Sequence, residues 1–274
     1  MKTGWLRKQL RIIPKARRAA ALAWRMPGLY QNWPLALLSL VARHRQTFVL
    51  RLRRGVEFCL HAGTMDTYIV NEIWVDKVYT PSPRFSIRDG WVVIDLGGHK
   101  GIFSVFAATS ARDVKVYSFE PSPENFACLS HNIQLNSLSN VKAFNVAVGA
   151  RDGESTLSLY GENGQNTLLQ RSNPELQPAA SVKVDTWTLV RVIKTVASPV
   201  NLLKMDIEGM EYEALFSCPV DYLQGVERIA LEYHDVLVRV PHRISDLVAF
   251  LNARGFSTCL TAGREILLAE RTHH

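Results

Sequence analysis

The feature that most constrains the fold is an apolar segment that ends directly in a glycine-rich turn. Residues Trp91–Leu96 form an apolar run interrupted only by Asp95, and the turn Gly97–Gly101 follows at once. A run of this kind is typical of a strand buried on both faces, as in a parallel sheet covered by helices. Glycine lets the backbone turn sharply there and approach a ligand closely. The segment therefore predicts the first strand and the first ligand-binding turn of an α/β domain.

Strand-like and helix-like segments then alternate along the chain, which predicts a doubly wound, mostly parallel sheet with a C-terminal antiparallel hairpin. The expected strands are Trp91–Leu96, Val114–Phe119, Val141–Val148, Val200–Met205 and Arg228–Tyr233, with the hairpin formed by Phe256–Thr261 and Glu265–Ala269. The expected helices are Ile102–Ser110, Pro123–Asn136, Thr186–Val196, a segment ending near Phe216, and Ile244–Ala253. Two short alternating runs, Ser155–Tyr160 and Ser181–Val184, lie in a turn-rich region.

The N-terminal part of the chain differs sharply in charge from the rest. Residues 1–54 contain 13 of the 32 Lys/Arg residues and none of the 25 Asp/Glu residues. Prolines predict helices over Pro14–Arg25 and Pro34–Arg45, so residues 1–47 are expected to form a basic helical arm. Such an arm suits an anionic membrane surface; packing on the body or in a homodimer is the alternative.

Two further segments complete the expected organisation. Residues 48–83 are predicted to hold two strands around Arg54-Gly55 and a helix over Asp66–Lys77, and residues 84–274 to form the catalytic domain. The four cysteines form no Cys-x-x-Cys pair, no apolar run is long enough to span a bilayer, and no secretory signal is evident. These features predict a cytoplasmic protein, peripheral to the inner face of the membrane if the arm binds lipid.

The ends of the first two strands predict a nucleotide-type ligand site. Ligands of open α/β sheets bind beyond the carboxyl ends of the strands. Glu120 ends the second strand, 19 residues past Gly101, where a carboxylate accepts hydrogen bonds from a ribose diol. Enzymes that use NAD have a similar pair, but the turn lacks the Gly-x-Gly-x-x-Gly spacing, and Asp95 would repel a pyrophosphate while suiting an ammonium group.

Several motifs in order resemble the FkbM-type methyltransferases. They are Val92–Ser104, Phe119–Pro123, Leu129–Asn136, Ala147–Gly149, Lys204–Glu211 and Glu232–His234. The resemblance implies a class I, Rossmann-like methyltransferase fold, S-adenosylmethionine as the methyl donor, and methylation of a hydroxyl on a sugar, glycan or natural product. It also implies a donor site made by Asp95, Gly97, Gly98, His99, Gly101, Glu120, Pro121 and Ala147. One departure is Gly98-His99, where the family usually has Ala-Asn.

Methyl transfer to oxygen needs a base or a metal that lowers the cost of an alkoxide. Asp206 and Glu208 follow the fourth strand, and Glu232 and His234 end the next. In one hypothesis His234 is the general base while Asp206 and Glu208 orient substrate hydroxyls. In the other, Asp206, Glu232 and His234 bind magnesium or manganese. A structural alternative has Asp206 capping a helix, with Glu208 accepting from backbone amides.

The sequence also predicts the surroundings of two further charged residues. Lys204 lies inside a buried strand, and Asp206 or Glu232 is its expected partner. Asp185 is expected to cap the helix beginning near Trp187, or otherwise to line the pocket.

Three other functions stay open at this stage. They are an NAD-dependent oxidoreductase, an RNA methyltransferase, and a non-catalytic module that docks on membranes. The basic charge lies on the arm and no RNA-binding motif is present, so nucleic acid is not an expected partner.

Overall fold

The computed structural model describes residues 23–160, 166–169, 177–196, 199–234 and 242–272. The chain forms two compact units, Met1–Asn71 and Glu72–His274. Among the described residues, no helix is both long and apolar enough to cross a bilayer. No disulfide joins the four cysteines.

The first unit contains helical residues 23–29, a second helix and a strand hairpin. Helix α3 (Trp33–Val41) precedes the antiparallel strands β1 (Gln46–Arg51) and β2 (Glu57–Ala62), and helix α4 (Asp66–Trp74) begins at its end. The turn of the hairpin passes through Gly55, whose φ of 83° favours glycine. Both predicted strands are therefore confirmed, but α3 and α4 end before the expected Arg45 and Lys77. Most of the helix expected over Pro14–Arg25 lies outside the described residues.

The second unit is built on a seven-stranded sheet in the order β11-β12-β10-β9-β3-β4-β5. Its strands are β3 (Val92–Leu96), β4 (Lys115–Phe119), β5 (Val141–Phe144), β9 (Leu202–Met205), β10 (Arg228–Glu232), β11 (Phe256–Leu260) and β12 (Ile266–Arg271). The five strands from β10 to β5 run parallel, and β12 joins β10 antiparallel as part of the terminal hairpin. The predicted doubly wound sheet and C-terminal hairpin are confirmed.

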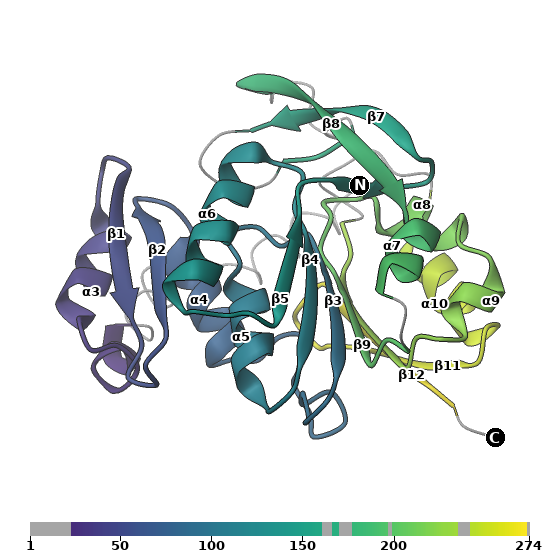
Figure 1. Ribbon diagram of the computed structural model, residues 1–274, viewed down its shortest axis with the longest axis horizontal. Coiled ribbons are helices and arrows are strands. Elements are labelled where there is room, and N and C mark those ends of the chain that lie inside the picture. Colours follow the sequence, from purple (N-terminus) through teal and green to yellow (C-terminus); the bar gives the residue numbers. More distant parts are fainter. Residues whose placement is uncertain (1–22, 161–165, 170–176, 197–198, 235–241, 273–274) are drawn as a thin grey trace, which may run out of the picture. The chain divides into compact units, whose positions relative to one another are not determined.

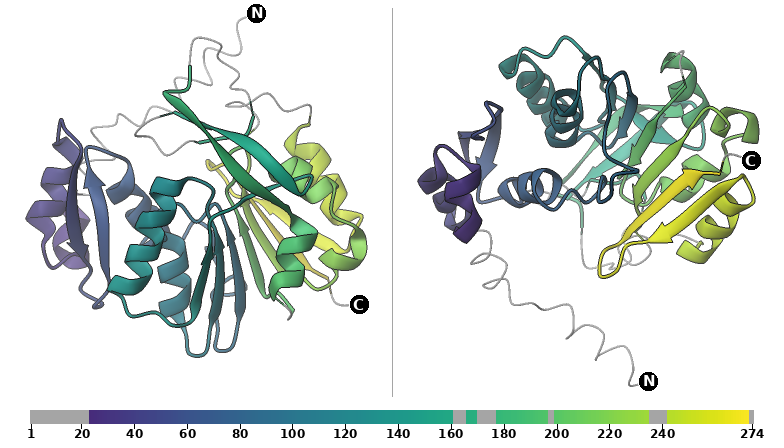
Figure 2. Two further views of the ribbon diagram at one scale, coloured as in Figure 1. Left: turned by 45° about the horizontal axis from the view of Figure 1, so that its top comes forward. Right: turned by 90° about the horizontal axis from the view of Figure 1, so that it is seen from below.

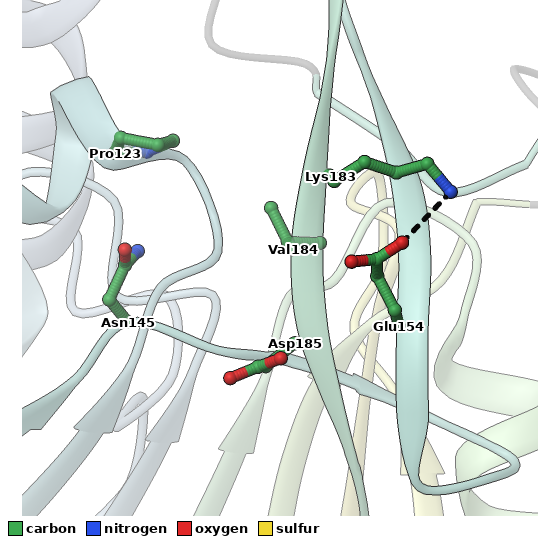
Figure 3. Close-up of a pocket in the computed structure, with 6 residues that line it drawn as sticks. All are labelled: Pro123, Asn145, Glu154, Lys183, Val184 and Asp185. Carbon is green, nitrogen blue, oxygen red and sulfur yellow. Dashed lines mark ion pairs between the residues drawn. The ribbon is translucent and has the colours of Figure 1, made fainter.

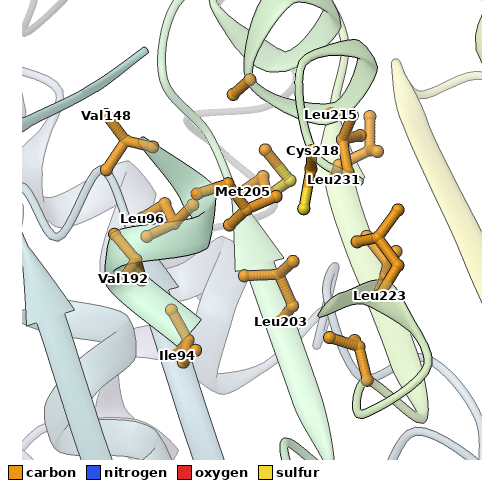
Figure 4. Close-up of a cluster of buried hydrophobic side chains, with 14 of the residues drawn as sticks. Ile94, Leu96, Val148, Val192, Leu203, Met205, Leu215, Cys218, Leu223 and Leu231 are labelled. Atoms are coloured by element: carbon orange, nitrogen blue, oxygen red, sulfur yellow. The ribbon is translucent and has the colours of Figure 1, made fainter. Parts of the chain in front are cut away.

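Helices cover both faces of this sheet (Figure 1). Helices α5 (Ile102–Ser110) and α6 (Pro123–Leu135) lie on one side, and α7 (Leu189–Val196), α8 (Glu211–Phe216), α9 (Val220–Leu223) and α10 (Ile244–Asn252) lie on the other. Alternate residues of the central strands, such as Ile94, Leu96 and Leu203, point into the core beneath the second group (Figure 4). This alternation turns Asp95 to the opposite face, toward α5.

The expected third strand, Val141–Val148, is two strands. The chain leaves the main sheet after Phe144 and forms β6 (Ala147–Gly149). This strand pairs with β8 (Ala180–Thr188), which pairs in turn with β7 (Gly153–Leu159), so that the small sheet has the order β6-β8-β7. The small sheet therefore lies beyond the carboxyl end of β5, and Figure 2 shows it from two further sides. Pairing with β6 extends β8 through Thr188, so the helix expected from Thr186 begins only at Leu189.

Candidate active site

The glycine-rich turn links the ends of β3 and β4. The backbone amides of Gly97 and Gly98 both donate to the carbonyl oxygen of Phe119, at 2.9 and 3.0 Å. Gly97 and Gly101 have φ angles of 77° and 80°, which strain any residue with a side chain. Gly101 then opens helix α5, so the turn brings the amino end of a helix to the edge of the sheet.

The glycines of the turn also permit close packing within the protein. A Cβ on Gly97 would overlap the carbonyl oxygen of Asp206, and one on Gly101 would lie 2.7 Å from a methyl group of Leu129. A side chain at Gly97 is therefore excluded by the end of β9. The glycine turn is expected to belong to the donor site and Asp206 to the site of the chemistry. These two parts are therefore in direct contact.

Asp95 is fully buried and forms an ion pair with Lys204. The Nζ of Lys204 lies 3.0 Å from Oδ1 of Asp95 and donates to the carbonyl oxygen of Gly97 at 2.8 Å. Ser104 donates to the other oxygen of Asp95 at 2.6 Å. The expected partners of Lys204 were Asp206 or Glu232; Asp206 lies farther away, at 3.9 Å. Burial lowers the pKa of Lys204, but Asp95 and Asp206 outweigh it and raise the pKa overall.

Glu120 is buried at the end of β4, where its carboxylate accepts from the loop that surrounds it. The amide of His99 donates to Oε2 at 2.7 Å, and the amide of Ser122 donates to Oε1 at 2.9 Å. A carboxylate has about four lone-pair positions, so it retains acceptor capacity for a ligand hydroxyl. Burial raises the pKa of Glu120 to about 7, although these hydrogen bonds lower it.

The remaining predicted donor residues include His99, Pro121 and Ala147. His99 has a φ of 49°, a conformation that asparagine adopts more readily than most residues. The carbonyl oxygens of Glu120 and Pro121 accept from the side chain of Asn145, at 2.8 and 3.1 Å. Ala147 is buried in the small sheet and packs in a cluster with Leu157 and Val184.

His234 lies among four carboxylates. Its Nδ1 lies 3.2 Å from Oε1 of Glu211, while its Nε2 faces Asp206 Oδ1, Glu208 Oε2 and Glu232 Oε1 at 3.8, 3.8 and 4.0 Å. Burial lowers the pKa of His234, but Glu211 and then Asp206 and Glu208 outweigh it, so the pKa lies well above its ordinary value. Burial and the charge of Asp206 raise the pKa of Glu232.

Glu211 organises this cluster, a role that the sequence did not identify. Its carboxylate accepts from the amides of Ile207 and Gly209 at 2.8 and 2.9 Å and has no exposed surface. The expected role of Asp206 as helix cap is wrong, because α8 begins later, after Met210. The expected role of Glu208 as an acceptor from backbone amides stays a prediction.

Tyr79 is a second residue that sequence reasoning missed. Its hydroxyl lies within hydrogen-bonding distance of Asp206 Oδ2 at 3.0 Å and Glu232 Oε2 at 3.1 Å. Burial and these carboxylates raise its pKa, which keeps the phenol protonated. No local pattern marks Tyr79, since it lies 127 residues before Asp206 in the chain.

A pocket of about 250 Å³ opens beside the small sheet (Figure 3). It is lined by Pro123, Asn145, Glu154, Lys183, Val184 and Asp185. Asp185 lies within β8 and lines this pocket, so the expectation that it caps a helix is wrong. Thr188 takes the capping position, accepting from the amide of Arg191 at 3.3 Å.

One ligand atom from each of Asp206, Glu211 and His234 lies within 4.8 Å of the others, a spacing that suits a metal ion. Both oxygens of Glu211 already accept from backbone amides, however. Glu211 therefore orients His234 through the Nδ1 atom of the imidazole, and the Nε2 atom faces the other three carboxylates.

Sequence comparisons identify the family. A family model described as the methyltransferase FkbM domain matches residues 95–258. The 31-O-demethyl-FK506 methyltransferase FkbM of Streptomyces tacrolimicus is 25% identical over 262 residues, covering 81% of this chain and 96% of that protein. Methyltransferase 1 of Beauveria bassiana (strain ARSEF 2860) is 25% identical over 185 residues, and the match covers 61% of this chain and 73% of that protein.

Solved structures of methyltransferases also match this chain at low identity. A SAM-dependent methyltransferase from Aquifex aeolicus has a TM-score of 0.39 and 12% identity, covering 74% of this chain and 93% of that one. Since the family model spans more than half of the sequence, the assignment rests on that match and displaces the NAD-dependent oxidoreductase alternative. The chain belongs to the FkbM family of S-adenosylmethionine-dependent methyltransferases.

Proposed function

We propose that the protein transfers a methyl group from S-adenosylmethionine to a hydroxyl oxygen of a sugar, glycan or related small natural product. The observation that carries this proposal is the contact between the glycine turn and the carboxylate cluster, through Gly97 and Asp206. A donor held at the turn would present its methyl group beside oxygen ligands suited to a hydroxyl. The name of the Streptomyces relative, which refers to a 31-O-demethyl compound, supports oxygen as the acceptor atom.

The donor is proposed to bind along the turn and at Glu120. The remaining acceptor capacity of the Glu120 carboxylate suits a ribose diol, and the amino end of α5 adjoins it. When bound, the donor supplies an electrophilic methyl group on a sulfonium centre. Asp95 is proposed to act indirectly, because its contacts with Lys204 and Ser104 are internal.

The acceptor hydroxyl is proposed to bind among Asp206, Glu208, Glu232 and His234. A protonated His234 has no free nitrogen with which to take a proton, so the raised pKa disfavours it as a general base. The alternative is a divalent cation held by Asp206, Glu232 and His234, whose binding would displace the proton from Nε2 of His234. Ligand atoms about 2.1 Å from one ion lie about 3.0 Å apart when adjacent and about 4.2 Å when opposite. The separations of 3.8–4.0 Å from Nε2 fall within that range. Among the described residues, the group whose ligand atoms all lie within 4.8 Å of one another is Asp206, Glu211 and His234, so Glu232 would have to move to complete the site.

Metal binding is tested directly by titrating Mg²⁺ or Mn²⁺ into chelator-treated protein, with calorimetry and the melting temperature as readouts. Saturable binding that Glu208→Gln and Glu232→Gln weaken at least roughly tenfold is expected. Asp113→Asn is the matched control, since Asp113 is an exposed carboxylate that precedes β4. Full methyl transfer after exhaustive chelation, with no saturable binding, would eliminate the metal and leave the carboxylates as the base.

The reaction itself is tested by incubating the protein with methyl-labelled S-adenosylmethionine and panels of hydroxylated sugars and natural products. We expect label on an oxygen of the acceptor, with S-adenosylhomocysteine as coproduct. Label on nitrogen or carbon only would contradict O-methylation while leaving the family assignment intact.

A further inference from the structure

Helix α3 has an apolar face toward solvent. Its sequence contains no charged residue, and Ala36 and Ser39 are the residues buried on its inner side. Pro34, Leu38 and Val41 share the opposite face, at i, i+4 and i+7. Leu38 is 62% exposed and Val41 is 71% exposed. The outer face of α3 is therefore apolar and exposed.

Tryptophan adds to this apolar surface. Trp24, in the helical residues 23–29, is 89% exposed, and Trp33 at the start of α3 is partly exposed. Tryptophan is enriched where protein meets the headgroup region of a bilayer, because its ring has an apolar body and a polar N–H group.

The charged side chains of residues 1–54 all have the same sign. Residues 1–54 contain 13 Lys/Arg residues and no Asp/Glu. Arg43, directly after α3, and Arg54, in the β1–β2 turn, are exposed. An ion pair between Arg51 and Glu57 neutralises only part of this excess positive charge. A strongly basic segment that contains an apolar helix face complements an anionic lipid surface, which offers acyl chains and negative headgroups together.

We propose that the outer face of α3, with Trp24 and the basic residues around it, is a docking surface for an anionic lipid bilayer. The helix is nine residues long, so it lies in the interface and does not span the membrane. Charge argues against a second copy as the occupant, because two identical faces would bring together two segments that each carry an excess of positive charge. The proposal is independent of the methyl-transfer chemistry, since it concerns only residues of the first unit.

Co-sedimentation of the full chain with vesicles tests the proposal. The probes are vesicles of phosphatidylcholine alone and vesicles with about 30% phosphatidylglycerol, each at low and high salt. We expect binding to the anionic vesicles that is at least roughly tenfold stronger than to the neutral ones and that weakens with salt.

Two sets of variants separate the apolar and the charge contributions. Leu38→Gln with Val41→Gln, and separately Arg43→Gln with Arg54→Gln, are each expected to weaken binding by roughly three- to tenfold. The control is Leu260→Gln, which changes a similarly exposed leucine in β11 of the second unit. Melting temperatures establish that each variant is folded, and donor affinity is expected to stay unchanged in all of them.

Three results would overturn the proposal. One is equal binding to neutral and anionic vesicles, and another is no binding to either. The third is full binding by both sets of folded variants, which would place the contact elsewhere. Capture of an acidic protein by wild type but not by these variants, without vesicle binding, would assign the face to a protein partner instead.

Discussion

Lys204 and Asp95 are direct neighbours across the parallel strands β9 and β3, and their side chains form an ion pair of 3.0 Å with both groups buried. The same ammonium group donates to the carbonyl oxygen of Gly97. The pair therefore neutralises two buried charges and also holds the first residue of the glycine turn.

Lys204→Met is expected to destabilise the protein by about 3–5 kcal/mol, because it leaves the Asp95 carboxylate buried without a counter-charge. The free energy of unfolding from urea denaturation measures the loss. Lys204→Met combined with Asp95→Asn is expected to recover part of it. Lys115→Met, at an exposed position of β4, is the control and should change stability by less than about 0.5 kcal/mol. A similarly small effect of Lys204→Met would show that the pair contributes little.

Donor affinity is expected to depend on the protonation of Glu120. Its pKa in the folded protein is about 7, so the carboxylate loses its charge as the pH falls through neutrality. A charged carboxylate accepts hydrogen bonds from a ribose diol better than the protonated acid. Calorimetry with S-adenosylhomocysteine should therefore show affinity rising from pH 5.5 to 8.5, and Glu120→Gln should bind more weakly with a flat profile. A wild-type profile without this rise would contradict the assignment.

The same shift affects stability without ligand. Because the pKa of Glu120 is higher in the folded protein than its ordinary value of 4.5, the folded state binds this proton more tightly. The stabilisation from the tighter binding of this proton in the folded state is therefore fully present below about pH 4.5, and it is lost as the pH rises toward 7. Urea denaturation of wild type and Glu120→Gln across this window measures the difference, which should shrink or reverse as the pH rises.

His99→Asn separates His99 from Glu120 as the source of pH dependence. The contact from His99 to Glu120 uses the backbone amide, which asparagine retains, and asparagine tolerates the positive φ of this position. We expect a stable variant whose donor affinity keeps the wild-type rise with pH. If the variant loses that rise while Glu120→Gln retains it, the titrating group is the His99 imidazole.

Tyr79→Phe tests whether the hydroxyl positions the carboxylates. The substitution removes the donor shared by Asp206 and Glu232, while the ring can keep its edge contact with Phe103. We expect kcat to fall roughly 10- to 100-fold with a smaller change in donor affinity, because the two carboxylates lose their fixed arrangement. Tyr117→Phe, in β4, is the control. An unchanged kcat, or equal effects of both substitutions, would contradict a positioning role.

The sequence alone predicted the features that depend on short stretches of chain. Apolar runs and glycine positions predicted the strands of the seven-stranded sheet, apart from the end of β5, and the turn after β3, because burial and backbone conformation impose local patterns. Spacing from the turn was enough to single out Glu120. The order of Asp206, Glu208, Glu232 and His234 after two buried strands predicted that they would meet at one edge of the sheet.

Only the tertiary structure decided how the charged groups pair. Register places Lys204 beside Asp95, folding brings Tyr79 to Asp206 and Glu232, and the loop after β9 delivers two amides to Glu211. The tertiary structure also determines that the chain leaves the main sheet between β5 and β6. These relationships join residues that are distant in the chain or compete for the same partner. Local sequence patterns describe which face a residue occupies, whereas strand register and packing determine which group lies opposite it.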